Sequence, residues 1–287
     1  MDRYYNHAGK FSPLGVVLGL LAGTVVSVPV AFAYNYGIFS IPEARFRVLC
    51  TIVYGALVGA ASGTAMCWGK VRSKAVAGLI SFGASLFALY LSWAVWILHL
   101  LYPSFWVFNP LRAALHPRRM WKFILAVSSK GSWSFNSGPP TSGFSLWVVW
   151  GSEAALLLGF GVLVAVALVK RRAFCERCEQ WCSQSQKLYF APVLSADQFK
   201  ARLEAEDLAS LQTLAPGDPK KPHFRVDLHS CADCHTLNTL SLVQNFARDR
   251  KTLVDKLVLS AEQAGAIRFS HETPVGVKAS ETGDAKA

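Results

Sequence analysis

Residues 156–178 read LLLGFGVLVAVALVKRRAFCERC and contain the point at which the character of this chain changes. An uncharged run is followed at once by the bases of residues 170–172 and then by Cys175 and Cys178, which form a Cys-x-x-Cys pair. A long apolar run that ends in basic residues is typical of a membrane-spanning helix. A Cys-x-x-Cys pair is typical of a metal or redox site in a folded region. The sequence therefore predicts a membrane-embedded half before Lys170 and a small soluble half after it.

The composition of the 287-residue chain changes at the same position. The whole chain is 52% hydrophobic and 16% charged, which is shifted toward membrane proteins. Twelve basic and three acidic residues precede Lys170, whereas 17 basic and 15 acidic residues lie from Lys170 to the end. Most of the net charge of +11 therefore lies in the connectors between apolar stretches, where contact with anionic lipid headgroups accounts for it. A nucleic-acid partner is not expected from this distribution.

Four apolar stretches are long enough to cross the hydrocarbon layer of a bilayer, which takes about 20 helical residues. They lack the polar face that buried helices of soluble proteins show. The first stretch is too long for a removable signal peptide and lacks a convincing cleavage site. We therefore expect four transmembrane helices in an integral, multi-pass membrane protein that contacts the lipid bilayer directly. The stretches are residues 13–36, 48–68, 75–102 and 146–169.

Two of the expected helices carry three glycines each at four-residue intervals. Glycines at this spacing form one stripe along a helix and let a neighbouring backbone approach closely. We expect this glycine-zipper pattern to pack the first two helices together or to form a self-association face of a homo-oligomer, although glycine is also common in membrane helices without such a role. The glycines are Gly15, Gly19 and Gly23 in the first helix, and Gly55, Gly59 and Gly63 in the second.

Glu153 is an acid about seven residues into the fourth stretch, roughly 10 Å along the helix. An acid at this depth is costly and normally faces protein or water. Two interpretations follow. Glu153 either handles protons or cations in a transporter or channel subunit, or it is a protonated, hydrogen-bonded structural group. The lack of a basic residue inside the four stretches favours the structural interpretation.

The connector before the fourth stretch mixes basic and bulky apolar residues over about residues 109–128. This mixture predicts a segment that lies in the headgroup plane. With that segment set aside, nine basic residues flank the spans on the side of the two termini, against Arg45 and Arg47 on the other side. The positive-inside rule then predicts that both termini are cytoplasmic.

The soluble half contains a second Cys-x-x-Cys pair, Cys231 and Cys234. Each such turn brings two thiolates toward one tetrahedral ion, so two turns supply the four ligands of a structural zinc site. The 52 residues between Cys178 and Cys231 exceed the roughly 15–20 of a compact ribbon, so an inserted unit is expected between the pairs. Zn²⁺ is the expected cofactor.

Two other uses of these cysteines stay open. A thioredoxin-like redox pair is expected at a helix start after a strand, whereas the first pair follows a membrane helix. The second pair and His235 form the Cys-x-x-Cys-His pattern of haem attachment, which takes place outside the cytoplasm and leaves the first pair unexplained. Candidate substitute ligands or neighbours of the metal site are Cys182, His229 and His235.

The remaining tail predicts a small α+β domain. Ser195 and Gln198 have the spacing of a capping box at a helix start, residues 224–228 alternate like a strand, and two leucine-rich segments flank a charged hairpin tip near residues 246–251. From about His271 onward the composition is small and polar, which is typical of disorder. The expected organisation is a four-helix transmembrane domain (1–169), a soluble zinc-binding domain with four cysteine ligands (170–270) and a disordered tail (271–287).

The two cysteine turns and the strand-like segments beside them resemble zinc-ribbon modules. The resemblance covers the tail alone and implies a mostly structural ion and a role in recruiting proteins or nucleic acids. The sequence has no phosphate loop, nucleophile elbow, HExxH motif or dinucleotide fingerprint. We expect a non-enzymatic membrane adaptor or regulator whose soluble domain binds a protein partner. The alternatives are a transporter or channel subunit that uses Glu153, and a membrane-bound thiol oxidoreductase.

Overall fold

A computed structural model shows that the chain forms two compact units. One unit is residues 7–172, and the other combines residues 1–6 with residues 173–287. Residues 109–115 of the expected headgroup segment and residues 273–287 of the expected disordered tail lie outside the described part of the chain. The structure describes residues 3–40, 43–101, 116–134, 140–182, 184–192, 195–205, 207, 214–246 and 249–272.

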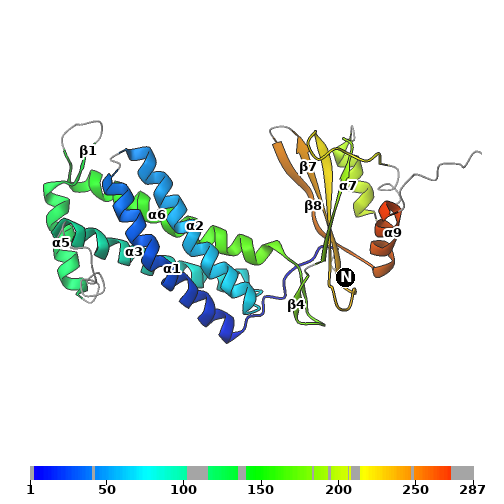
Figure 1. Cartoon of the computed structure of the whole chain (residues 1–287), viewed down its shortest axis with the longest axis horizontal. Helices are drawn as coiled ribbons and strands as arrows, with labels where there is room; N and C mark the ends of the chain where they lie inside the picture. The colour runs from blue at the N-terminus through cyan, green and yellow to red at the C-terminus, as the bar shows by residue number, and fades with distance from the viewer. Residues whose placement is uncertain are drawn as a thin grey trace, which may run out of the picture. The chain divides into compact units, whose positions relative to one another are not determined.

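Four long helices build the unit of residues 7–172 (Figure 1). Each predicted apolar stretch corresponds to one of them, and each is long and apolar enough to cross a membrane, which indicates an integral membrane protein. Helices α1 and α2 run in opposite directions, whereas α2 and α6 run in the same direction, as the order of their contacts shows. The helices are α1 (Pro13–Ser40), α2 (Ala44–Trp68), α3 (Lys74–Leu101) and α6 (Gly143–Arg171).

The two glycine stripes pack against different neighbours. A Cβ atom added to Gly15 would overlap the carbonyl oxygen of Gly69, at the end of α2. A Cβ atom added to Gly59 would overlap the carbonyl oxygen of Gly161 in α6. The stripe of α1 packs against α2, in line with the expected pairing of the first two helices, whereas α2 turns its own glycines toward α6. All six glycines are buried within the chain and do not form an open self-association face.

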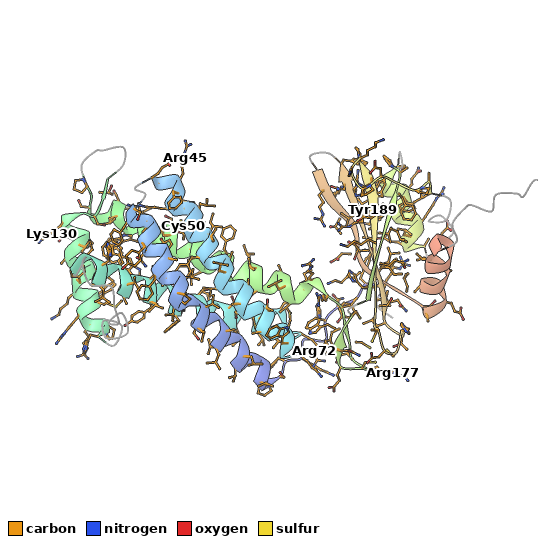
Figure 2. The ribbon with its side chains drawn as sticks, in the orientation of Figure 1. Arg45, Cys50, Arg72, Lys130, Arg177 and Tyr189 are labelled. Atoms are coloured by element: carbon orange, nitrogen blue, oxygen red, sulfur yellow. The ribbon has the colours of Figure 1, made fainter. Side chains whose placement is uncertain are left out.

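Helix α5 (Pro117–Lys130) packs across the end of the bundle where α3 ends and α6 begins (Figure 1). Its apolar stripe, which includes Met120 and Ile124, joins a core with residues of α3 and α6. Its basic residues are exposed, which suits an amphipathic helix at a headgroup boundary. Figure 2 shows Arg45 and Lys130 at this end of the unit and Arg72 at the other. A two-stranded hairpin, β1 (Trp133–Ser134) and β2 (Pro140–Thr141), precedes α6.

The other unit is built around a four-stranded antiparallel sheet in the order β5-β6-β7-β8. A short hairpin, β3 with β4, precedes the sheet, and two helices lie on one of its faces (Figure 1). The predicted small sheet-containing C-terminal region is thus present. Its elements are β3 (Phe174–Cys175), β4 (Gln180–Trp181), β5 (Gln184–Phe190), α7 (Ala196–Glu204), β6 (His223–Ser230), β7 (Asn238–Phe246), β8 (Asp249–Leu259) and α9 (Ala261–Glu272).

The core of this unit follows from strand alternation. Leu188, Val226 and Leu242 lie opposite one another on adjacent strands and are buried on the same face of the sheet. Helix α7 contributes Phe199 to this core, and α9 contributes Ile267. Because successive side chains in a strand point to opposite faces, the residues between these core positions form a more polar second face.

The helix starts of this unit are capped differently from the sequence prediction. Helix α7 does begin after Ser195, but the Ser195 side chain makes no capping hydrogen bond. The reciprocal box lies at α9, where the Ser260 N–H donates to Gln263 Oε1 at 2.8 Å and the Gln263 N–H donates to Ser260 Oγ at 3.1 Å. The Ser-x-x-Gln spacing occurs at both helices, so the spacing alone does not determine the backbone angles that a capping box needs.

The amino-terminal residues pair with the sheet of the unit that comprises residues 1–6 and 173–287. The Val258 N–H donates to the Arg3 carbonyl at 3.0 Å, and the Tyr5 N–H donates to the Lys256 carbonyl at 2.9 Å. This pairing covers β8, which is otherwise an edge strand with unpaired backbone groups. Residues 1–6 therefore group with the soluble unit, although their position in the sequence predicted that they belong to the membrane half.

We predict that Gly59→Leu strongly destabilises the helical unit, because its side chain would collide with the α6 backbone, which cannot move as a side chain can. Overpacking of this kind costs about 1–3 kcal/mol or more. Thermal unfolding of the detergent-solubilised protein measures the effect. Gly159→Leu on α6 is the matched control, since a Cβ there has no neighbour within 4 Å among the described residues. Equal melting temperatures for the two variants would contradict the packing described.

We also predict that deleting residues 2–6 makes β8 exchange its amide hydrogens faster, because the backbone hydrogen bond from Val258 is lost. Loss of one hydrogen bond worth about 1 kcal/mol corresponds to roughly fivefold faster exchange. Hydrogen-exchange mass spectrometry of the peptide that covers β8 measures the change. Arg3→Ala keeps the backbone carbonyl and is expected to exchange like the unaltered protein. Unchanged protection after the deletion would show that the pairing does not form.

Candidate metal centre

Two turns of the soluble unit carry the four cysteines of the Cys-x-x-Cys pairs. Cys175 ends β3 and Cys178 lies in the turn that leads to β4. This hairpin is closed by the Cys182 N–H, which donates to the Ala173 carbonyl at 2.8 Å. Glu179 completes the turn with a φ of 51°, a left-handed conformation that is uncommon outside glycine.

The second turn connects β6 with β7 and carries Cys231 and Cys234. The Cys231 N–H donates to the Leu237 carbonyl at 3.0 Å, and the His235 N–H donates to the Cys231 carbonyl at 3.2 Å. His235 has a φ of 50°, so both cysteine turns are completed by a residue in the left-handed region. The backbone hydrogen bonds of each turn therefore fix the conformation of the turn that carries its two cysteines.

The four sulfur atoms converge on a single point. All four lie within 4.8 Å of one another, and Cys175 Sγ is 3.5 Å from Cys234 Sγ. A tetrahedron with metal–sulfur bonds of about 2.3 Å has edges of about 3.8 Å, so this group matches the size of one ion's coordination shell. Cys175 and Cys231 are buried, whereas Cys178 and Cys234 are half-buried. The four-cysteine group is therefore able to hold a metal ion.

Side chains around the cysteines connect the two turns. The Gln180 amide on β4 donates a hydrogen bond to the Asp233 carboxylate between Cys231 and Cys234. Tyr5 packs against the cysteine cluster, and its hydroxyl bonds the backbone of Phe174: the Phe174 N–H donates to it at 3.0 Å. The amino-terminal segment thus supports the hairpin that carries the first cysteine pair.

The electrostatics of the cluster favour one thiolate in the metal-free protein. The Thr236 hydroxyl, 2.9 Å from the Cys234 sulfur, is the main group that lowers the pKa of Cys234, to about 6, and the Thr236 backbone N–H assists. The hydrogen bond to Cys234 is in turn the main cause that raises the pKa of Cys178 to about 12. Desolvation by burial raises the pKa of Cys175. A divalent ion would displace the remaining protons, so its affinity must fall as the pH falls.

The candidate substitute ligands do not belong to the four-sulfur group. Cys182 is buried beside it, and burial is the main cause that raises the pKa of Cys182 to about 12, which leaves it as a neutral thiol. His235 is exposed, and His229 lies on β6 outside the group. Haem attachment would leave the first cysteine pair without a role, whereas this geometry gives both pairs one common site.

Sequence reasoning missed Tyr5, Thr236 and the Gln180–Asp233 bond. Thr236 carries a local signal, since a hydroxyl residue two positions after a Cys-x-x-Cys pair can reach the last sulfur. Tyr5 has no such signal in the sequence, because its bonding partner Phe174 lies 169 positions further along the chain.

Glu153, the predicted intramembrane acid, is half-buried in α6. It lines a cavity of about 60 Å³ together with Arg47. No basic residue was expected inside the spans, and this expectation is wrong, because α2 begins at Ala44 and so includes Arg47 in its first turn.

Comparison of the chain with protein-family models, with curated proteins and with solved structures gives no match. The function is therefore inferred from the fold and from the geometry of the four cysteines.

We predict that a metal ion bound here is released on acidification, and that Thr236→Val moves the release to higher pH. Loss of the hydroxyl raises the pKa of Cys234, so protons displace the metal more readily. A shift of up to about one pH unit is expected for one lost hydrogen bond to a thiolate. Titration of the Co²⁺-loaded protein measures it, because the thiolate-to-cobalt absorption band disappears on release.

Thr236→Ser keeps a hydroxyl at this position and serves as the control, with release at the pH of the unaltered protein. Identical release curves for the valine and serine variants would contradict the role of Thr236.

Proposed function

We propose that this protein is a non-enzymatic membrane adaptor or regulator whose soluble unit is held together by one structural zinc ion and binds a protein partner. The observation that carries the proposal is the convergence of four sulfur atoms within 4.8 Å from two separate turns. Four thiolates in a tetrahedron suit Zn²⁺ and leave no open position for a catalytic water.

A structural role suits the place of the cysteines in the soluble unit. The β3–β4 hairpin contributes Ala173, Cys175 and Cys182 to a small cluster that is separate from the main core of the sheet. A hairpin of this size is marginal without support. An ion shared between Cys175 and Cys231 would fix the hairpin to the end of the sheet, as in the two-turn arrangement of zinc ribbons.

The topology of the chain supports one location for the soluble unit and the amino terminus. An even number of membrane spans returns the chain to the side on which it started, and Arg3 and Tyr5 pair with β8 on that side. Bases at the helix ends that face this side, including Lys70 and Lys170, favour the cytoplasm. A reducing compartment also keeps the cysteines available for metal.

The second face of the sheet is the surface that we assign to the protein partner. Lys187 is exposed on this face, opposite Asp227, and Asp227 forms an ion pair of 2.8 Å with Arg225. This face carries both positive and negative charges, as protein-binding surfaces do. Binding of nucleic acid would require a uniformly basic surface. Zinc would act on this surface indirectly, by fixing the β6–β7 turn at its end.

We predict that the purified full-length protein contains one zinc ion per chain and that Cys231→Ser loses it. The variant is expected to insert into membranes normally, while its soluble unit becomes sensitive to protease, because the hairpin is released. Elemental analysis and limited proteolysis measure the two effects. Cys182→Ser is the matched control, since Cys182 is buried beside the site but is not one of the four sulfur donors.

Recruitment is tested in the same proteins with a photo-crosslinking amino acid at position 187. A defined protein adduct is expected in cells that express the Cys182→Ser control and is expected to be lost with Cys231→Ser. Adducts to lipid alone, or the same protein adduct with both variants, would contradict a zinc-dependent adaptor.

A further inference from the structure

A cavity of about 60 Å³, with both polar and apolar lining residues, lies among the four long helices of the helical unit. Its polar lining comes from Tyr34 and Asn35 of α1, Arg47 and Thr51 of α2, Ser92 of α3 and Glu153 of α6. Gly55 of α2 packs against Leu157 of α6, and the two helices are parallel, so Thr51 is level with Glu153 and Arg47 lies one turn closer to the helix starts. The cavity is therefore near the end of the bundle that α5 crosses.

The Asn35 side chain lines this cavity and carries a buried acceptor without a donor among the described residues. Its amide nitrogen donates to the Ala31 carbonyl at 2.8 Å and approaches the Ser92 carbonyl at 3.3 Å, which fixes the orientation of the amide. Asn35 is 1% exposed, and no described residue donates a hydrogen bond to its Oδ1 atom. A buried acceptor without a donor is costly, so Oδ1 calls for a ligand that donates.

Two hydroxyl groups of the lining, those of Tyr34 and Thr51, have their hydrogens bound within the protein. Thr51 Oγ1 donates to the Arg47 carbonyl at 2.9 Å. In the 3.1 Å contact between Tyr34 and Thr51, the Tyr34 hydroxyl must then be the donor. Both hydroxyl hydrogens are thus committed inside the protein, and lone pairs of the Tyr34 oxygen remain for a ligand.

The charges of the lining balance. Glu153 is the acid of the described lining and Arg47 is its base, and the two are close enough to interact electrostatically. Tyr34 is the titratable group that α1 presents to the cavity. Helix α3 presents Ser92 and the uncharged rings of Trp93 and Trp96, and no described residue of α5 lines the cavity. A metal cation would meet one carboxylate beside a guanidinium, which is a poor site for it.

We propose that this cavity is a hydrated proton-binding site inside the membrane half, in which Glu153 accepts the proton. Its volume holds a few water molecules, since each needs about 10–15 Å³ of such space. Asn35 Oδ1 and the Tyr34 oxygen accept hydrogen bonds from this water. The rings of Trp93 and Trp150, which pack edge to face at 4.9 Å, form an apolar side of the cavity.

A hydronium ion in the cavity loses one O–H bond and becomes water, and a new O–H bond forms on a carboxylate oxygen of Glu153. The charge of the site rises from zero to +1, because Arg47 remains a cation. Acidification therefore fills the site and a rise in pH empties it. This role lies outside that of the soluble unit and does not depend on zinc.

Infrared difference spectroscopy of the full-length protein in lipid nanodiscs tests the proposal. A carboxylic-acid C=O band is expected to grow as the pH is lowered, and one such band is expected to be lost in Glu153→Gln. Ser152→Ala is the matched control, because Ser152 is an exposed neighbour whose hydroxyl bonds its own helix, and it is expected to keep the band. Identical spectra for Glu153→Gln and the unaltered protein would overturn the proposal.

Arg47→Gln provides a second variant with a directional result. Removal of the neighbouring positive charge favours the protonated form of Glu153, so the band is expected to reach half its height at a higher pH, by about one unit or more. A merely structural role for Arg47 would not move the band in this direction, and an unchanged midpoint would count against the proposal.

The ligand itself is tested by adding NaCl at constant pH, with choline chloride at the same ionic strength as the control. A band that is insensitive to sodium supports a proton site. Loss of the band with sodium and not with choline would assign the cavity to a sodium ion and overturn the proposal.

Discussion

Four thiol groups held within one coordination shell are the constraint on which the soluble unit depends. They cannot all ionise without a cation, because each thiolate raises the cost of the next. Without the ion most of them keep their protons and contribute little to stability, whereas a bound ion would join two turns whose cysteines Cys178 and Cys231 are 53 residues apart. A bound ion would also fix the turn at the end of the sheet face on which partner binding is proposed, so the proposed recruitment would depend on metal-assisted folding of this unit.

The helical unit depends on a different constraint, the close approach of backbones. Gly59 lies against Gly161, and Gly15 lies against Gly69, so backbone meets backbone on two faces of α2. In lipid there is little hydrophobic drive between helices, and such contacts supply the dispersion energy that holds them together. This packing also encloses polar groups, since Asn35, Thr51 and Glu153 face one cavity only because the helices approach so closely.

Sequence reasoning was reliable where the determinant is local. Hydrophobic length predicted four helices, and alternation predicted the strand that forms most of β6. It did not reveal which distant elements pair, and it placed the capping box at the wrong helix because that local pattern occurs twice. The glycine spacing does not encode which helix a stripe faces, and the Ser-x-x-Gln spacing occurs at two helices but caps only α9. The edge pairing of Arg3 with Val258 joins residues too far apart for any periodicity to reveal.

Helix α6 connects the two proposed sites through a single element. Glu153 lies near its start, and 18 residues later the helix ends at Arg171, about 27 Å away at 1.5 Å per residue. The first cysteine pair begins four residues after that end, so the chain reaches the β3–β4 hairpin directly from the helix that carries the proton acceptor. Helix α6 also packs backbone to backbone on α2, the helix that carries Arg47. The proposed proton acceptor thus lies in the same helix from whose end the cysteine-bearing segment of the chain continues.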